Sequence, residues 1–101
     1  MKLIIVLGMV EHEKEIAKMF KESNIPIYSK VDIEGIKSGH KQVDLSNWFG
    51  SDEDTDLSIM FFAFIANGNA EELYQKVEVF NANEDRIAPL HAFQLPVEKF
   101  I

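Results

Sequence analysis

The longest apolar run in the chain, residues 57–66 (LSIMFFAFIA), predicts a strand at the centre of a sheet. The run is too short to cross a bilayer as a helix. Large apolar side chains fall at both odd and even positions, which is typical of a strand that is covered on both faces. The period alone leaves a helix open, but the aromatic and β-branched residues and the sharp polar boundaries favour a strand.

The same pattern of apolar and polar positions predicts two helices and three more strands, the strands at residues 2–10, 27–36 and 90–97. The first of these is apolar without a break from Leu3 to Leu7, and Gly8 marks a bend or the close approach of another segment. Apolar residues three and four apart define the buried sides of helices at 11–24 and 70–80. The residues on these two sides are Ile16, Met19, Phe20 and Ser23, and then Ala70, Leu73, Val77 and Phe80.

The strand at 27–36 alternates between apolar and polar residues, which is typical of a strand with one face in water. The first set is Ile27, Ser29, Val31 and Ile33, and the second is Tyr28, Lys30, Asp32 and Glu34. We expect the first set to face the core and the charged set to face solvent. Charges on one face of a strand suit the edge of a sheet.

The order of the predicted elements is β-α-β-β-α-β. It predicts an α+β fold of the ferredoxin-like type, an antiparallel sheet with strand order 4-1-3-2 and both helices on one face. We expect a single domain that comprises residues 1–101. The two central strands, 2–10 and 57–66, are apolar on both sides. Because an uncovered apolar face of this size promotes aggregation, we expect it to be buried against other copies of the chain.

Composition narrows the classes of function. The formal net charge of −7 disfavours binding to a phosphate backbone, so we expect no nucleic-acid partner. The chain contains no cysteine, which removes disulfides and thiol nucleophiles. We expect a cytoplasmic protein that is not inserted in a membrane. No nucleophile stands beside a plausible base in a recognisable motif, so we also expect no enzymatic activity.

Three stretches of sequence carry a family resemblance. The chain starts MKLI, residues 31–41 read VDIEGIKSGHK and residues 93–101 read FQLPVEKFI. Together with the element order, these stretches resemble the PII family of signalling proteins along essentially the whole chain. The resemblance implies a homotrimer that binds a small effector in clefts between subunits. It also implies that the long T-loop-like connection, 35–56, contacts a target protein, which is a transporter, an enzyme or a regulator.

One segment departs from the PII pattern. Nucleotide-binding PII proteins carry a loop of the G-D-G-K type before the last strand, whereas residues 83–89 read NEDRIAP here. In that loop, glycine amides and a lysine hold the phosphates of the nucleotide. Residues 83–89 contain neither glycine nor lysine, and Arg86 is their only basic residue. The classical mode of ATP binding is therefore disfavoured. No cofactor is indicated with certainty; a small anion or a divalent metal is the candidate ligand.

The resemblance and the positions of charged residues suggest two sets of contact residues. We expect the cleft to be lined by Gly35, Lys37, Gly39, His40, Arg86 and His91, with Lys37 and Arg86 attracting an anion. Trp48 and Phe49 are two large aromatics in a polar connection, where exposure to water is costly. They either fold back onto the protein body or form an exposed anchor for the target protein.

The histidines support a different interpretation. In the expected topology, His12 follows the first strand and His91 begins the last, so both lie at one end of neighbouring strands. With Glu13 as a carboxylate ligand, they would supply the nitrogen and oxygen atoms of a divalent-metal site. The alternative function is therefore a trimeric metal-binding protein with a CutA-like role, although the CutA loop signature is missing. Half-exposed loop histidines without a ligand explain the same pattern.

Overall fold

The computed structural model describes residues 1–36, 55–66, 70–83 and 88–101. In chain order, the elements are β1 (Lys2–Met9), the 3-10 turn η1 (Val10–His12), α1 (Glu13–Glu22), β2 (Ser29–Ile36), β3 (Thr55–Ile65), α3 (Ala70–Asn81) and β4 (His91–Pro96). The described residues thus form one four-stranded sheet and two α-helices. This confirms the predicted α+β class, with element bounds that differ from the predicted ones by one or two residues at most ends.

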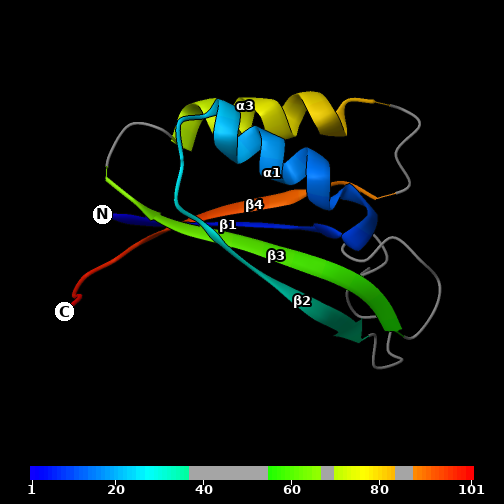
Figure 1. Ribbon diagram of the computed structural model, residues 1–101, viewed down its shortest axis with the longest axis horizontal. Coiled ribbons are helices and arrows are strands. Elements are labelled where there is room, and N and C mark those ends of the chain that lie inside the picture. Colours follow the sequence, from blue (N-terminus) through cyan, green and yellow to red (C-terminus); the bar gives the residue numbers. More distant parts are fainter. Residues whose placement is uncertain (37–54, 67–69, 84–87) are drawn as a thin grey trace, which may run out of the picture.

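The sheet is antiparallel throughout and has the strand order β2-β3-β1-β4. Counted from the other edge, this order reads 4-1-3-2. The two strands with unbroken apolar runs, β1 and β3, are the central pair and are in register from Lys2 opposite Ile65 to Met9 opposite Ser58. Both helices pack on the same face of the sheet (Figure 1). We call this side the helix face and the other side the open face.

The hydrophobic core lies between the sheet and the two helices. All eight residues of the predicted helix stripes are buried, which confirms both stripes. They pack against alternate residues of the central strands, which are Ile4 and Val6 of β1 and Ile59, Phe61, Ala63 and Ile65 of β3. The Phe61 ring lies 5.6 Å from the Phe20 ring of α1 and 5.6 Å from the Tyr28 ring, measured between centroids. This aromatic group fixes α1 over the edge of the sheet.

Two local features explain where α1 begins and ends. The helix begins at Glu13, two residues later than predicted, because residues 10–12 form a 3-10 turn first. It ends at Glu22, and Asn24 then adopts a left-handed conformation with φ 59°. Asparagine tolerates this conformation better than most residues, and the amide of Ile25 donates to the Phe20 carbonyl at 3.0 Å. The helix therefore ends two residues before the predicted bound at residue 24.

Gly8 stands where another segment comes close, as predicted. A Cβ atom at this position would lie 2.5 Å from Cδ2 of Leu90 and 3.1 Å from Cδ1 of Ile16. The bare backbone of Gly8 therefore gives room for Leu90, whose side chain is almost fully buried.

The orientation of β2 differs from the prediction. Ile27 precedes the strand and is 83% exposed. The Tyr28 ring contacts Phe61 on the helix face, and Nζ of Lys30 lies 3.1 Å from a carboxylate oxygen of Glu13 on α1. The polar set therefore faces the helices, and Val31 lies on the open face. Lys30, Asp32 and Glu34 are exposed to water, as predicted, but they lie on the side of the helices and not on the open face, and Lys30 pairs there with Glu13 of α1.

The start of β4 is held by the last residue of α3. The Asn81 side chain donates from Nδ2 to the carbonyl of Leu90 at 2.9 Å, and its Oδ1 accepts from the Leu90 amide at 2.7 Å. These two bonds satisfy both backbone groups of a residue that is buried. They also fix the distance between the end of α3 and the sheet.

Replacing Asn81 by alanine should lower the free energy of unfolding by about 1–2 kcal/mol, because both backbone groups of Leu90 lose their partner. Urea denaturation followed by circular dichroism measures this change. Gln75→Ala, at an exposed position of the same helix, is the control and should have little effect. Equal stability of the two variants would show that water replaces the Asn81 side chain without cost.

Candidate functional site

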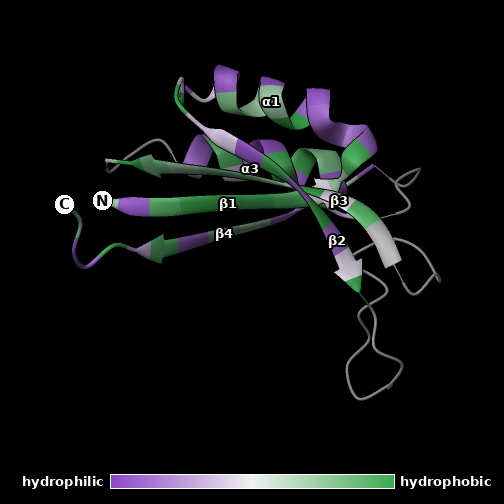
Figure 2. Cartoon of the chain, turned by 60° about the horizontal axis from the view of Figure 1, so that its bottom comes forward, coloured by the Kyte–Doolittle hydropathy of each residue, from purple (hydrophilic) through white to green (hydrophobic). Residues whose placement is uncertain are grey.

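The open face of the sheet is built from the alternate residues that do not face the helices. Side chains of paired residues lie on the same face, so the register gives the rows across the strands. From β4 toward β2 the rows are Leu95–Leu3–Phe64, then Phe93–Ile5–Phe62–Ser29, then His91–Leu7–Met60–Val31, and last Met9–Ser58–Ile33. Figure 2 shows both helices on one side of the sheet, and no described helix covers the other side.

This face is apolar across all four strands. Its residues in the middle of the sheet are half-buried by their neighbours, whereas Phe64 is 58% and Leu95 is 44% exposed. Single exposed apolar residues are common, but a continuous apolar sheet face marks a surface that binds another protein or a ligand. The open face is therefore the strongest candidate for a functional surface in the described residues.

Two of the predicted cleft residues belong to this sheet. His91 lies in the row of Leu7 and Met60, and its ring stacks on that of Phe93 with centroids 6.5 Å apart. Gly35 is buried in β2 opposite Asp56. Gly35 was predicted both as part of the strand at 27–36 and as the first residue of the connection 35–56; β2 runs to Ile36, so Gly35 belongs to the strand.

Gly35 and His91 are far apart within one protomer. They lie on the two edge strands, which are separated by three strand spacings, or about 14 Å. Gly35 is also four residues further along β2 than Val31, which shares the His91 row. A small ligand that touches both residues would therefore have to lie between two protomers. The other predicted contact residues lie outside the described residues; they are Lys37, Gly39, His40 and Arg86 in the cleft, and Trp48 and Phe49 for the target protein.

The predicted metal ligands His12, His91 and Glu13 do not come together. His12 lies on the helix face, where its ring meets that of Phe80 edge-on at 5.0 Å, whereas His91 belongs to the open face. Glu13 pairs with Lys30. Within the described ranges, no three histidine, aspartate or glutamate side chains are grouped to hold a metal ion. The prediction considered which end of the sheet each histidine occupies, but not which face.

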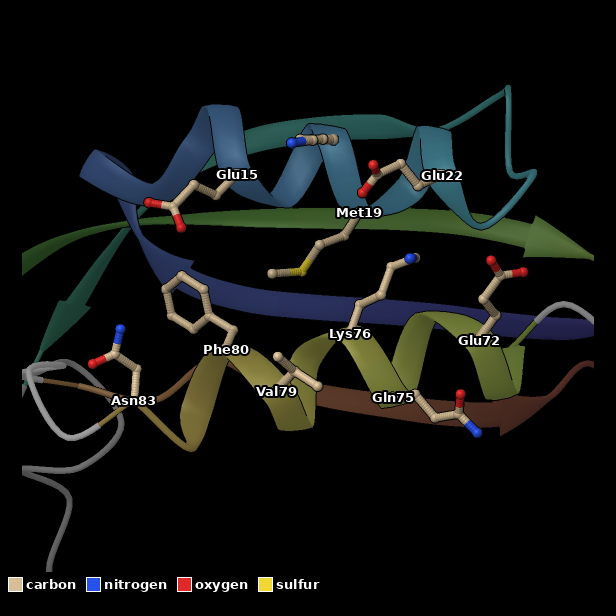
Figure 3. A pocket seen from close by; sticks show the side chains of 10 residues that line it. Glu15, Met19, Glu22, Glu72, Gln75, Lys76, Val79, Phe80 and Asn83 are labelled. Atoms are coloured by element: carbon tan, nitrogen blue, oxygen red, sulfur yellow. The ribbon is translucent and has the colours of Figure 1, made fainter.

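Sequence reasoning missed a groove between the two helices. Met19 and Phe80 form its floor, and its rim carries acidic and basic side chains (Figure 3). The rim charges are those of Glu15, Lys18, Glu22, Glu72 and Lys76. Because both signs alternate along the rim, the groove does not favour one class of charged ligand. Val79 lies beside the groove and is 74% exposed. An apolar residue among the polar residues on the outer side of α3 is the feature of the sequence that could have indicated this surface.

Two hydroxyl groups, those of Ser58 and Tyr74, lie on opposite faces of the sheet and differ in their hydrogen bonding. The Ser58 hydroxyl in the last row of the open face is buried, and the structure gives Oγ no hydrogen-bond partner among the described residues. On the helix face, the Tyr74 hydroxyl donates to Oε1 of Gln94 at 3.0 Å. Burial, and then the charge of Glu71, raises the pKa of Tyr74.

None of the helices that the structure describes combines the length and the apolar character needed to span a membrane.

Comparison with known proteins gives a fold and no family. No protein-family model matches the chain, and no curated protein matches it either. Among solved structures, the chain is similar to a DUF3240 family protein from Shewanella baltica OS155, with a TM-score of 0.65 and 12% sequence identity. The similarity covers 98% of this chain and 91% of that protein. At this level of identity, the two chains share a fold.

Proposed function

We propose that the chain is a small PII-like regulatory protein that acts as a homotrimer. In this proposal the protomers associate through the open face, a small effector binds in the clefts between them, and the connection 35–56 contacts a target protein. The observation that carries the proposal is the apolar open face, to which all four strands contribute. We also infer that the sheet and its two helices are a plait of the ferredoxin-like type.

Burial of the open face supplies the driving force for association. Each Å² of apolar surface removed from water contributes about 25 cal/mol, so an interface over several of these rows outweighs the entropy lost on assembly. The four rows contain no acidic or basic residue, and their polar members are His91, Ser29 and Ser58. Beyond them, the register continues to Gly35 opposite Asp56. Charged groups would oppose burial, and their absence from the rows favours a protein partner over water.

The same assembly would create the ligand cleft. In the proposed trimer, the β2 edge of one protomer would approach the β4 edge of the next, which would bring Gly35 toward His91 of its neighbour. Lys37, Gly39 and His40 follow Gly35 in the chain, and Arg86 precedes β4. Their charges favour a small anion, whereas the acidic segment 83–89 without glycine disfavours ATP. Trp48 and Phe49 would anchor the target protein.

Sedimentation velocity at micromolar concentration tests the proposal. We expect a particle with three times the chain mass of 11.6 kDa. A thermal-shift screen with bicarbonate, adenine nucleotides and divalent metals tests the ligand, because a ligand of the native state raises the melting temperature. We expect stabilisation by a small anion that is lost in Lys37→Ala and in Arg86→Ala, with His12→Ala as a control that keeps it.

Three results would contradict the proposal. A stable monomer at micromolar concentration removes its basis. Stabilisation by ATP contradicts the expected loss of nucleotide binding. Stabilisation by divalent metals alone, abolished by His91→Ala, favours the metal-binding alternative with ligands from more than one protomer.

A further inference from the structure

The C-terminal residues form an arm that leaves the body of the protein. We define the arm as residues 97–101. The Val97 amide donates to the carbonyl of Met1 at 3.2 Å, and beyond this bond the chain runs past the end of the sheet, close to the N-terminus (Figure 1). Every arm residue after Val97 is exposed. Among them is the large aromatic side chain of Phe100, which is 71% exposed.

A second apolar surface lies at the same end of the sheet. It is the first row of the open face, Leu3, Phe64 and Leu95, which we call the end patch. Its outer members, Phe64 and Leu95, are among the most exposed apolar residues of the strands. The next pairs in the register, Lys2 with Ile65 and with Pro96, lie between the end patch and the start of the arm. The arm and the end patch therefore belong to one end of the sheet.

The arm does not cover the end patch of its own chain. Phe64 and Phe100 both keep more than half of their side-chain surface exposed in the isolated protomer. Each protomer therefore presents one apolar arm and one apolar end patch. In a closed cyclic assembly, the arm of each copy can cover the end patch of the next, so that no arm and no patch is left over. The side chains of Glu98 and Lys99 carry opposite charges, so the side-chain charges of the arm sum to zero.

We propose that the arm of each protomer docks on a second copy of this chain, with Phe100 packed against Phe64 and Leu95 of the end patch. This inference rests on the proposed homo-oligomer and adds the contact that links one protomer to the next. Aromatic residues in such positions carry a large share of the binding energy of protein interfaces.

Sedimentation of the full-length Phe100→Ala variant over a range of concentrations tests this contact. We expect the dissociation constant of the oligomer to rise by about tenfold or more, as for truncation of an aromatic hot spot. Phe100→Leu should recover most of the affinity. Val79→Ala removes an equally exposed apolar side chain from α3 and should leave the dissociation constant unchanged. An oligomer that is equally stable with and without Phe100 would overturn the arm contact and leave the proposed homo-oligomer standing.

Disulfide capture tests the geometry directly, because the chain has no cysteine of its own. Phe64→Cys and Phe100→Cys are made as separate proteins, mixed and oxidised, so that any 64–100 disulfide joins two chains. We expect the yield of the 64–100 disulfide to be clearly higher than the yield of the 79–100 disulfide from a mixture of Val79→Cys and Phe100→Cys. Equal yields would overturn the proposal, and so would a double variant that links 64 to 100 only within one chain. A wild-type protein that is monomeric would instead overturn the homo-oligomer and the arm contact together.

Discussion

Replacing Phe62 by glutamate should dissociate the protein into folded monomers. Phe62 lies in the second row of the open face, between Ile5 of β1 and Ser29 of β2. In an interface over this face, three or more carboxylates would have to be buried without partners, at a cost of several kcal/mol for each. In the monomer, the carboxylate remains in contact with water. We therefore expect the dissociation constant to rise by at least about a hundredfold.

Sedimentation velocity gives the mass of the Phe62→Glu variant, and circular dichroism shows whether it remains folded. Val79→Glu is the matched control, since it places the same charge at an exposed apolar position on α3. This control should keep the oligomer. A Phe62→Glu protein that sediments like the wild type would show that the open face is not the interface.

Replacing the neighbouring residue Phe61 by alanine should instead lower the stability of the fold itself. Phe61 points to the helix face and has no exposed surface. Its ring is packed against those of Phe20 and Tyr28, so alanine would leave a cavity that the rigid sheet cannot close. Such substitutions cost about 3–5 kcal/mol, a large part of the 5–15 kcal/mol that stabilise a typical domain.

Urea denaturation of Phe61→Ala at fixed protein concentration measures this loss. Val79→Ala is the comparison and should change the free energy of unfolding by less than about 0.5 kcal/mol, because its side chain is exposed. A loss below about 1 kcal/mol in Phe61→Ala would mean that α1 shifts to fill the space. The two adjacent phenylalanines thus separate the stability of the protomer from its association.

The sequence was sufficient to predict the helices and the central strands, because the spacing and the length of their apolar segments both indicate the element. The two helix stripes followed from apolar residues three and four apart, and all of them are buried. The two-sided apolar runs of β1 and β3 identified these strands as the central pair. Gly8 also followed from the sequence, because a glycine inside an apolar strand has few explanations other than a close neighbour, here Leu90.

The predictions failed where they had to assign residues to the helix face or to the open face of the sheet. Alternation in β2 separates two sets of residues, but it does not state which set meets the helices. The pairing of Lys30 with Glu13 and the packing of Tyr28 on Phe61 decide this, and both depend on where α1 lies. The same problem separated His12 from His91, which share an end of the sheet but not a face. Most of the predicted cleft and target contacts lie outside the described residues and stay predictions.

If the proposed homo-oligomer buries the sheet face that the described residues leave uncovered, the heat resistance of the protein depends on its abundance. Association withdraws folded molecules from the unfolding equilibrium, so a concentrated solution should melt at a higher temperature than a dilute one. A cell that makes little of the protein would hold it closer to the threshold of unfolding and of proteolysis. Synthesis level would then set the lifetime of the molecule as well as its amount.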